Sequence, residues 1–227
     1  MLSFPAVVKW AAMKILLLTL CLFGTAASAE EPPKAMTKLA VILQSPDVPP
    51  GSFATKPKIM YRAGNGYCRI EEEPDPDHGI HGLTIINEPN VWMVNRFNKT
   101  AQHIVDSGPT FNCRLPIFAD SSKLQEAEAK KIMELEFGHE LDFFKGQGIT
   151  PSKGPVMQTK ETMGYTLKIG ESTLALFTYG TPERPLAVSR THGEKTDIFW
   201  YSGYGQIEFD PKLFAKPADV KIQESKP

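Results

Sequence analysis

The sequence lacks the motifs that mark common enzyme classes and nucleic-acid-binding proteins. It contains no G-x-S-x-G elbow, no Walker loop and no G-x-G-x-x-G motif. His139-Glu140 begins a zinc-protease motif, but Phe143 stands where the second histidine is required. The 227 residues include 25 basic and 26 acidic side chains, so no basic excess points to nucleic acid. We therefore expect no catalytic residues, no cofactor and no nucleic-acid partner.

Long apolar runs are also missing. The most apolar segment, Ile15–Phe23, is far shorter than the roughly 20 residues that a membrane-spanning helix needs. It follows Lys14 and precedes small residues, among which Ala27 and Ala29 form an A-x-A cleavage site. This arrangement is typical of a bacterial secretion signal, which we assign to residues 1–29.

Removal of the signal leaves one domain-sized chain. Residues 30–227 are enough for a single domain with a sizeable core, whether translation starts at Met1 or at Met13. Lys9 and Lys14 leave with the signal, so 23 basic residues face 26 acidic ones, a net charge of −3. We predict a periplasmic protein with no integral membrane segment after cleavage.

Cysteine is scarce, and its use fits an oxidising compartment. Cys21 lies in the signal, so Cys68 and Cys113 remain. Two cysteines in a secreted chain most simply pair, and these two are not arranged as a C-x-x-C redox motif. Closing a loop of this size contributes about 4 kcal/mol in the chain-entropy model. We predict a structural disulfide.

Strand-length apolar runs separated by turn signals occupy most of the chain. The strongest local signal is Asn65-Gly66, between KIMYR and YCRIE, because a tight hairpin turn demands positive φ angles. The predicted strands are Leu39–Leu43, Lys58–Arg62, Tyr67–Glu71, Gly82–Asn87, Val91–Arg96, Thr100–Asp106, Val156–Met163, Tyr165–Gly170, Ser172–Gly180, Leu186–Thr191 and Thr196–Ser202.

The middle of the chain changes from strand to helix periodicity. Residues 122–137 are rich in helix formers, and Leu124, Ile132 and Leu135 fall on one face of a 3.6-residue repeat. Residues 139–144 are predicted to form a second short turn of helix. We expect this helical insertion between two groups of strands.

The order of elements predicts an α+β fold that is mainly β. A curved antiparallel sheet, or half-open β-barrel, with a helical lid on its concave face is the physical solution. Val91–Val94 and Ile198–Tyr201 are apolar at consecutive positions, so they need cover on both faces or border an apolar cavity. The closing segment, residues 209–222, is predicted to be a loop.

Several motifs appear in a recognisable order along the chain. KIMYRAGNGYCRIEEE has a strand, a glycine-containing turn and a strand that ends in Arg69-x-Glu71; KETMGYTLKI, ERPLAVSR and the closing FDPKLFAKP follow. In this order, over roughly residues 36–224, they resemble the LolA/LolB-like periplasmic superfamily. The Cys68–Cys113 pair and the insertion after it are not expected of the lipoprotein carrier itself, so the resemblance is to an uncharacterised branch.

This resemblance implies an apolar cavity between sheet and lid that receives acyl chains, and it implies no enzymatic activity. The residues that we expect to line the cavity are Ile86, Trp92, Val94, Tyr165, Leu167 and Trp200 on strands, with Leu124, Ile132 and Leu135 on the lid. Which face of each strand points inward is left open by the sequence.

One polar stretch offers metal-ligating side chains. His78 and His81 lie close to Asp75 and Asp77, and such nitrogen and oxygen donors suit Zn²⁺ or Cu²⁺. The same stretch contains prolines and a glycine that are typical of a solvated connection between strands. We favour the connection and assign no metal, keeping the two histidines as candidates.

Three functions remain in view. The leading hypothesis is a non-enzymatic periplasmic carrier for an apolar ligand, either a lipid or the acyl chain of a lipoprotein. The second is a structural or interaction protein of the envelope, with a filled core and a protein partner. The third, a metal-dependent hydrolase, needs a cluster of polar residues that the sequence does not reveal.

Overall fold

The computed structural model describes residues 33–105, 113–118 and 125–224. The predicted signal, residues 1–29, therefore lies outside the described residues, as does Leu124 of the predicted lid. The described residues belong to one compact unit, residues 33–227. Among the helices that the structure describes, none is long and apolar enough to span a membrane.

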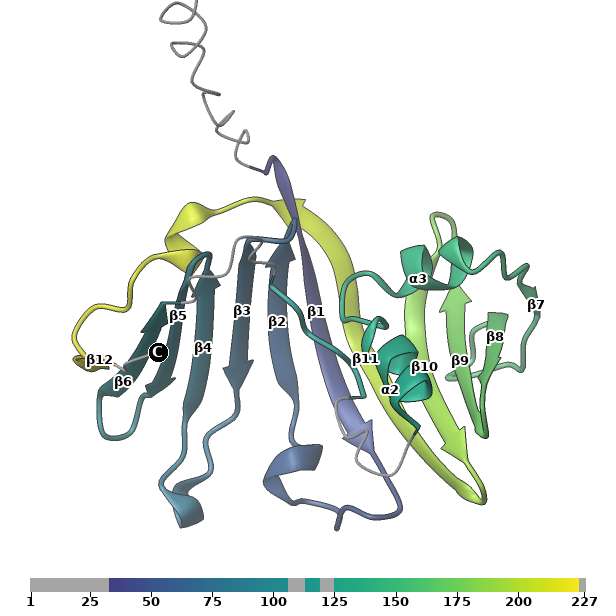
Figure 1. Cartoon of the computed structure of the whole chain (residues 1–227), viewed down its shortest axis with the longest axis horizontal. Coiled ribbons are helices and arrows are strands. Elements are labelled where there is room, and N and C mark those ends of the chain that lie inside the picture. The colour runs from purple at the N-terminus through teal and green to yellow at the C-terminus, as the bar shows by residue number, and fades with distance from the viewer. Residues whose placement is uncertain (1–32, 106–112, 119–124, 225–227) are drawn as a thin grey trace, which may run out of the picture. The chain divides into compact units, whose positions relative to one another are not determined.

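Twelve strands of the described residues form a single sheet in the order β12-β6-β5-β4-β3-β2-β1-β11-β10-β9-β8-β7 (Figure 1). The strands are β1 Ala35–Gln44, β2 Lys58–Ala63, β3 Tyr67–Glu72, β4 Gly82–Asn87, β5 Asn90–Asn95, β6 Thr100–Val105, β7 Ser152–Lys153, β8 Met163–Ile169, β9 Ser172–Tyr179, β10 Arg184–His192, β11 Lys195–Glu208 and β12 Lys221–Glu224. All neighbouring strands are antiparallel except β12 and β6, which are parallel. The sheet is curved and does not close on itself, as predicted.

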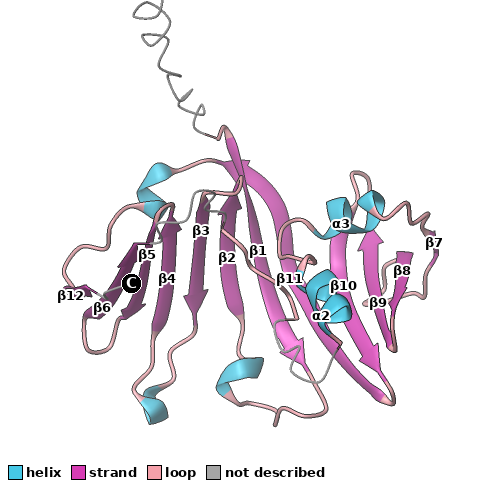
Figure 2. Ribbon diagram, in the orientation of Figure 1, coloured by secondary structure: helices cyan, strands magenta, loops and turns pink. Residues whose placement is uncertain are grey.

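Two α-helices, α2 Glu126–Met133 and α3 Glu140–Gly146, lie against one face of this sheet (Figure 2). They contact β8 and β9, and their apolar side chains join the largest core cluster. We call this side of the sheet the helix-side face and the other side the opposite face. The fold class is thus confirmed: mainly β, with a helical insertion packed on one face of a curved sheet.

The predicted helix over 122–137 ends earlier than expected, at Met133. Residues after it pair with an earlier segment of the chain: the Ile117 amide donates to the Leu135 carbonyl at 3.0 Å, and the Phe137 amide to the Leu115 carbonyl at 2.9 Å. These long-range bonds compete with continuation of the helix. The second short helix predicted near 139–144 is confirmed as α3.

The strand predicted at Val156–Met163 is wrong. Only Met163 lies in a strand; Gln158 and Thr159 have φ angles of +50° and +63°, which place a tight turn between Met157 and Lys160. Positive φ interrupts the extended backbone that a strand requires.

The closing segment, residues 209–222, was predicted to be a loop, and this prediction is wrong in part. A 3₁₀ turn, Pro211–Phe214, is followed by β12, which pairs with β6 from Lys221↔Thr100 to Glu224↔His103. Two further 3₁₀ turns cover Phe53–Thr55 and Pro76–His78. A four-residue strand that depends on a partner over a hundred residues away leaves no local periodicity to detect.

Val91–Val94 and Ile198–Tyr201, the two runs that are apolar at consecutive positions, are not buried equally on the two faces of the sheet. On β5, Trp92 and Val94 are buried on the opposite face against Val220 and Ile222, while Met93 on the helix-side face is 41% exposed. On β11, Tyr201 is buried on the helix-side face and Trp200 is half-buried on the opposite face. The expectation of cover on both sides is therefore wrong at Met93.

Candidate functional site

The segment Cys113–Phe118, which we call the strap, is tied to the helix-side face by a disulfide and a buried arginine. Cys68 and Cys113 form the predicted disulfide, with their Cα atoms 6.4 Å apart. Arg62 lies opposite Cys68 in the β2–β3 register, so both attachments leave the sheet at neighbouring positions.

Arg62 holds two segments at once, the strap through Cys113 and the residues Glu136 and Phe137 that follow α2. Its side chain is 4% exposed, and its guanidinium donates to the carbonyls of Cys113 at 2.7 Å and Phe137 at 3.0 Å. Its Nη2 also lies 2.7 Å from Glu136 Oε2. A buried charge is tolerated only when it is paired and hydrogen-bonded in this way. The strap is therefore fixed across the sheet.

Glu140 anchors the start of α3 to β11. Its carboxylate accepts hydrogen bonds from the Tyr201 hydroxyl at 2.5 Å, the Tyr204 hydroxyl at 3.0 Å and the Gly138 amide at 2.9 Å. Burial raises the pKa of this carboxyl above its ordinary value, because the charged form loses its hydration. Burial and the nearby Glu140 charge also raise the pKa of both tyrosines. The three bonds satisfy this fully buried acid.

The strap covers an apolar pocket of about 330 Å³ on the helix-side face. We call it the β2–β4 pocket; it is lined by Lys58, Met60, Ile70, Glu72 and Thr84 of the sheet, Arg114, Leu115 and Pro116 of the strap, Phe137, and Phe199 of β11. Met60 and Ile70 face each other in the β2–β3 register and lie on the same face as the strap. Ligand pockets in proteins are about 300–1,000 Å³ and mostly apolar, so this pocket is at the lower end of that range.

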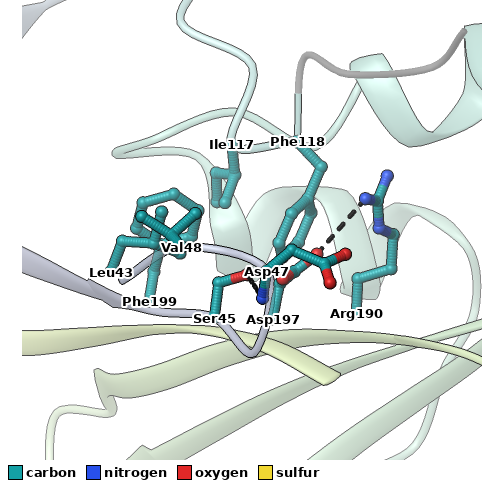
Figure 3. Close-up of a pocket in the computed structure, with 9 residues that line it drawn as sticks. All are labelled: Leu43, Ser45, Asp47, Val48, Ile117, Phe118, Arg190, Asp197 and Phe199. Atoms are coloured by element: carbon teal, nitrogen blue, oxygen red, sulfur yellow. Dashed lines mark hydrogen bonds and ion pairs between the residues drawn. The ribbon is translucent and has the colours of Figure 1, made fainter. Parts of the chain in front are cut away.

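A second pocket, of about 260 Å³, is lined in part by Ile117 and Phe118 of the strap (Figure 3). We call it the β10–β11 pocket; its lining consists of Leu43, Ser45, Asp47, Val48, Ile117, Phe118, Arg190, Asp197 and Phe199. It is more polar than the first pocket. Arg190 pairs with Asp197 at 3.3 Å, and its guanidinium carbon lies 5.2 Å from the centre of the Phe118 ring.

Phe199 is shared by both pockets. Its ring centroid is 5.7 Å from that of Phe118 and 5.2 Å from that of Phe137, which it meets edge-on. The strap contributes Leu115 and Pro116 to one pocket and Ile117 and Phe118 to the other. Phe199 and the strap thus contribute to the lining of both pockets.

Strand register divides the predicted cavity residues between the two faces of the sheet. Ile86, Tyr165 and Leu167 point to the helix-side face, since Ile86 is level with Cys68, and Tyr165 is level with Leu176 of the main core. Trp92, Val94 and Trp200 point to the opposite face. These six side chains therefore cannot border one cavity.

The predicted lid residues pack into the core. Ile132 and Leu135 have no exposed surface and belong to the same core cluster as Tyr165. Leu167 is partly buried and packs against this cluster. A third, smaller pocket of about 170 Å³ lies between β1 and β11 around Gly203. None of the eight described candidates lines any of these three pockets.

Sequence reasoning missed the residues that do line the β2–β4 pocket. Met60 and Ile70 lie at alternating positions of the predicted hairpin, and Phe199 lies in a run that was singled out for its apolar character. Leu115 follows the predicted disulfide cysteine. The disulfide was the available signal, because it brings the strap onto the hairpin that carries Cys68.

The two candidate metal-ligating histidines have different surroundings. The His78 Nδ1 atom is 3.0 Å from Asp75 Oδ2, and the His78 side chain is 73% exposed. The His81 ring packs edge-on against Phe97 and lies 3.5 Å from the Arg96 guanidinium. Within the part of the chain that the structure describes, no three His, Cys, Asp or Glu residues are grouped to hold a metal ion.

Comparison with known proteins shows distant structural similarity to several solved structures. No protein-family model matches the chain, and no curated protein matches it. An uncharacterised conserved protein from Thermus thermophilus is similar with a TM-score of 0.46 and 11% identity, over 95% of this chain and 99% of that one. A LolA superfamily protein from Nitrosomonas europaea has a TM-score of 0.32 and 10% identity, over 82% and 91% of the two chains.

Part of a larger protein, PNGF-II, is similar with a TM-score of 0.35 and 8% identity, over 84% of this chain and 31% of that one. The function of the present chain therefore has to be inferred from its own residues and pockets.

Proposed function

We propose that this protein is a non-enzymatic periplasmic carrier that binds the hydrocarbon chain of a lipid or of a lipoprotein in the β2–β4 pocket. The observation that carries the proposal is the apolar pocket of about 330 Å³ between the sheet and the strap. Its floor is formed by Met60 and Ile70, and its walls by Leu115, Phe137 and Phe199. A hydrocarbon chain binds to such an apolar surface without needing hydrogen-bonding side chains.

The energetics of chain burial suit this lining. Each buried methylene contributes about 0.8 kcal/mol, so a chain of about ten methylenes contributes roughly 8 kcal/mol before entropic costs. The secretion-like leader and the Cys68–Cys113 disulfide support a periplasmic location, because disulfides persist in oxidising compartments.

The test uses protein purified from its compartment without detergent. Mass spectrometry of an organic extract should reveal a lipid, and a fluorescent fatty acid should bind to the emptied protein. The absence of both a co-purified lipid and fatty-acid binding would contradict the proposal.

A pair of matched variants locates the site. Ile70→Trp fills the β2–β4 pocket and should weaken binding about tenfold, the equivalent of about 1.4 kcal/mol. Ile59→Trp is the control, since Ile59 is also half-buried but points to the opposite face, next to Met60 in β2. Both variants should retain the wild-type melting temperature within a few degrees. Equal weakening by both would place the ligand elsewhere.

A second candidate is an envelope interaction protein, which the filled core under the helices favours. Ile132, Leu135 and Phe144 have no exposed surface, so the space between the helices and the sheet is occupied there. Affinity capture from an envelope extract separates the two functions. A stoichiometric protein partner without bound lipid supports the second candidate, and bound lipid supports the first.

A further inference from the structure

The mouth of the β2–β4 pocket carries three charged side chains, Lys58, Glu72 and Arg114. Lys58 and Glu72 oppose each other in the β2–β3 register, with Lys58 Nζ 3.8 Å from Glu72 Oε1. Lys58 Nζ also lies 5.0 Å from the centre of the Phe53 ring. These two charges therefore offset each other at the sheet side of the mouth.

Arg114 carries the remaining positive charge. Its Nε lies 3.9 Å from Glu136 Oε1, beyond hydrogen-bond distance. The other oxygen of Glu136 is held at 2.7 Å by buried Arg62, which already neutralises that carboxylate. The Arg114 side chain is 64% exposed although it lines the pocket, so it lies where the pocket opens to solvent.

We propose that the pocket takes an amphiphile with an anionic head group, a carboxylate or a phosphate, which binds Arg114 at the mouth while the hydrocarbon chain lies on Met60 and Ile70. This inference rests on the proposed function and adds the class of ligand to it. Leu115 follows Arg114 directly and lines the same pocket, so head group and chain are contacted by adjacent residues.

The chemistry of arginine suits this role. The planar guanidinium donates two parallel hydrogen bonds to a carboxylate or a phosphate, whereas a neutral alcohol or a quaternary ammonium group offers no such acceptor pair. Because the Arg114 side chain is largely in solvent, water and salt screen its charge. We expect the anionic head group to strengthen binding about two- to fivefold.

Four ligands with the same chain provide the test. Dodecanoate, dodecyl phosphate, dodecanol and dodecyltrimethylammonium are titrated calorimetrically into delipidated protein, each below its critical micelle concentration. The two anions should bind about two- to fivefold more tightly than the alcohol, and the cation most weakly. The order of the two anions distinguishes a fatty-acid-like carboxylate from a phospholipid-like phosphate.

Variants then assign the preference to one residue. Arg114→Gln should remove the preference for anions, measured as the ratio of anion affinity to dodecanol affinity within each variant. Arg114→Lys should retain part of the preference, because lysine keeps the charge but not the paired donors. Arg184→Gln is the matched control, because Arg184 is exposed at the start of β10 and does not line the pocket. Raising the salt concentration should reduce the anion preference of the wild type.

The outcomes separate this inference from the proposed function. Equal affinity for all four ligands, or an anion preference that survives Arg114→Gln, overturns the role of Arg114 but leaves a chain-binding carrier in place. Preferential binding of the cation also overturns it. Failure of every ligand to bind overturns the carrier function itself.

Discussion

The helix-side face is covered in two different ways along the same sheet. Over β8 to β10, the helices α2 and α3 leave Leu174, Leu176 and Val188 with no exposed surface. Over β2 to β4, the part of the chain that the structure describes covers the face with the strap alone, and a pocket of about 330 Å³ remains beside Met60 and Ile70. Helical cover fills the space between layers, whereas a single extended segment does not. Binding is expected where the cover is thin.

The largest expected effect comes from removing the residue that holds the strap. Arg62→Met leaves Glu136 as a buried carboxylate without its partner, and breaking a buried pair in this way costs about 3–5 kcal/mol of unfolding free energy. Chemical denaturation measures the loss. The double variant Arg62→Met/Glu136→Leu should recover part of it, since no unpaired charge remains. A single variant as stable as the wild type would show that the disulfide alone fixes the strap.

A second comparison sets the filled core against the pocket. Leu176→Ala should cost about 3–5 kcal/mol, because a fully buried leucine leaves a cavity that its neighbours cannot fill. Ile70→Ala should cost about 1–2 kcal/mol, because Ile70 is half-buried beside an existing pocket and loses fewer contacts. Denaturant titrations of both variants give the two values. Equal losses would mean that the β2–β4 pocket is as tightly packed as the core.

Phe199 lines both pockets, and its replacement by alanine tests whether this side chain keeps them apart. Phe199→Ala should join the β2–β4 and β10–β11 pockets and favour longer chains, by about 0.8 kcal/mol, or fourfold, for each added methylene that becomes buried. Affinities of a series of fatty acids of increasing length check this for wild type and variant. Phe177→Ala is a suitable control, since Phe177 is half-buried on the opposite face. An unchanged length dependence would place the chain in one pocket only.

Glu140 joins the start of α3 to β11, and we expect its replacement to produce the smallest effect, because its three hydrogen bonds offset part of the cost of burial. Its pKa is raised in the folded protein, so its ionisation destabilises the fold. Stability from this group is present below the ordinary pKa of glutamate and declines as pH rises through the raised pKa. Glu140→Gln should remove that decline.

Denaturation of wild type and Glu140→Gln across acid to mildly alkaline pH compares the two slopes. The variant should gain stability relative to the wild type as pH rises, and then level off. A difference that does not change with pH would contradict the raised pKa. The Tyr201→Phe variant, which removes one donor to the carboxylate, should raise the pKa of Glu140 further and so extend the decline to higher pH.

Local features of the fold were predicted closely where neighbouring residues decide the structure. The hairpin around Asn65-Gly66 and the strand Gly82–Asn87 were predicted with nearly the observed bounds. The positive φ angle expected at Asn65-Gly66 is found instead at Gly64, where φ is +54°. Predictions failed where distant segments decide. The predicted helix over 122–137 ends at Met133 because the following residues pair with the strap, and β12 exists only through its pairing with β6.

The candidate site was predicted less well, and register explains why. A shift of one residue moves all the side chains of a strand to the other face of the sheet. An apolar run such as Val91–Val94 therefore does not show which side chains lie on which face, or which residues they pack against. Trp92 and Val94 face Val220 and Ile222 instead of a shared cavity with Tyr165. The disulfide between Cys68 and Cys113 was predicted because pairing of two remaining cysteines requires no knowledge of register.

The sequence by itself determined most of the strands, the presence of the helical insertion and the cysteine pair, since these depend on periodicity, turn chemistry and composition over short spans. It did not determine the turn at Met157–Lys160 or the strand β12. Only the tertiary structure decided which side chains meet in the β2–β4 pocket. Met60, Ile70, Leu115, Phe137 and Phe199 come from separate parts of the chain. Strand register and the attachment of the strap by Arg62 bring them together, and neither can be inferred from local sequence.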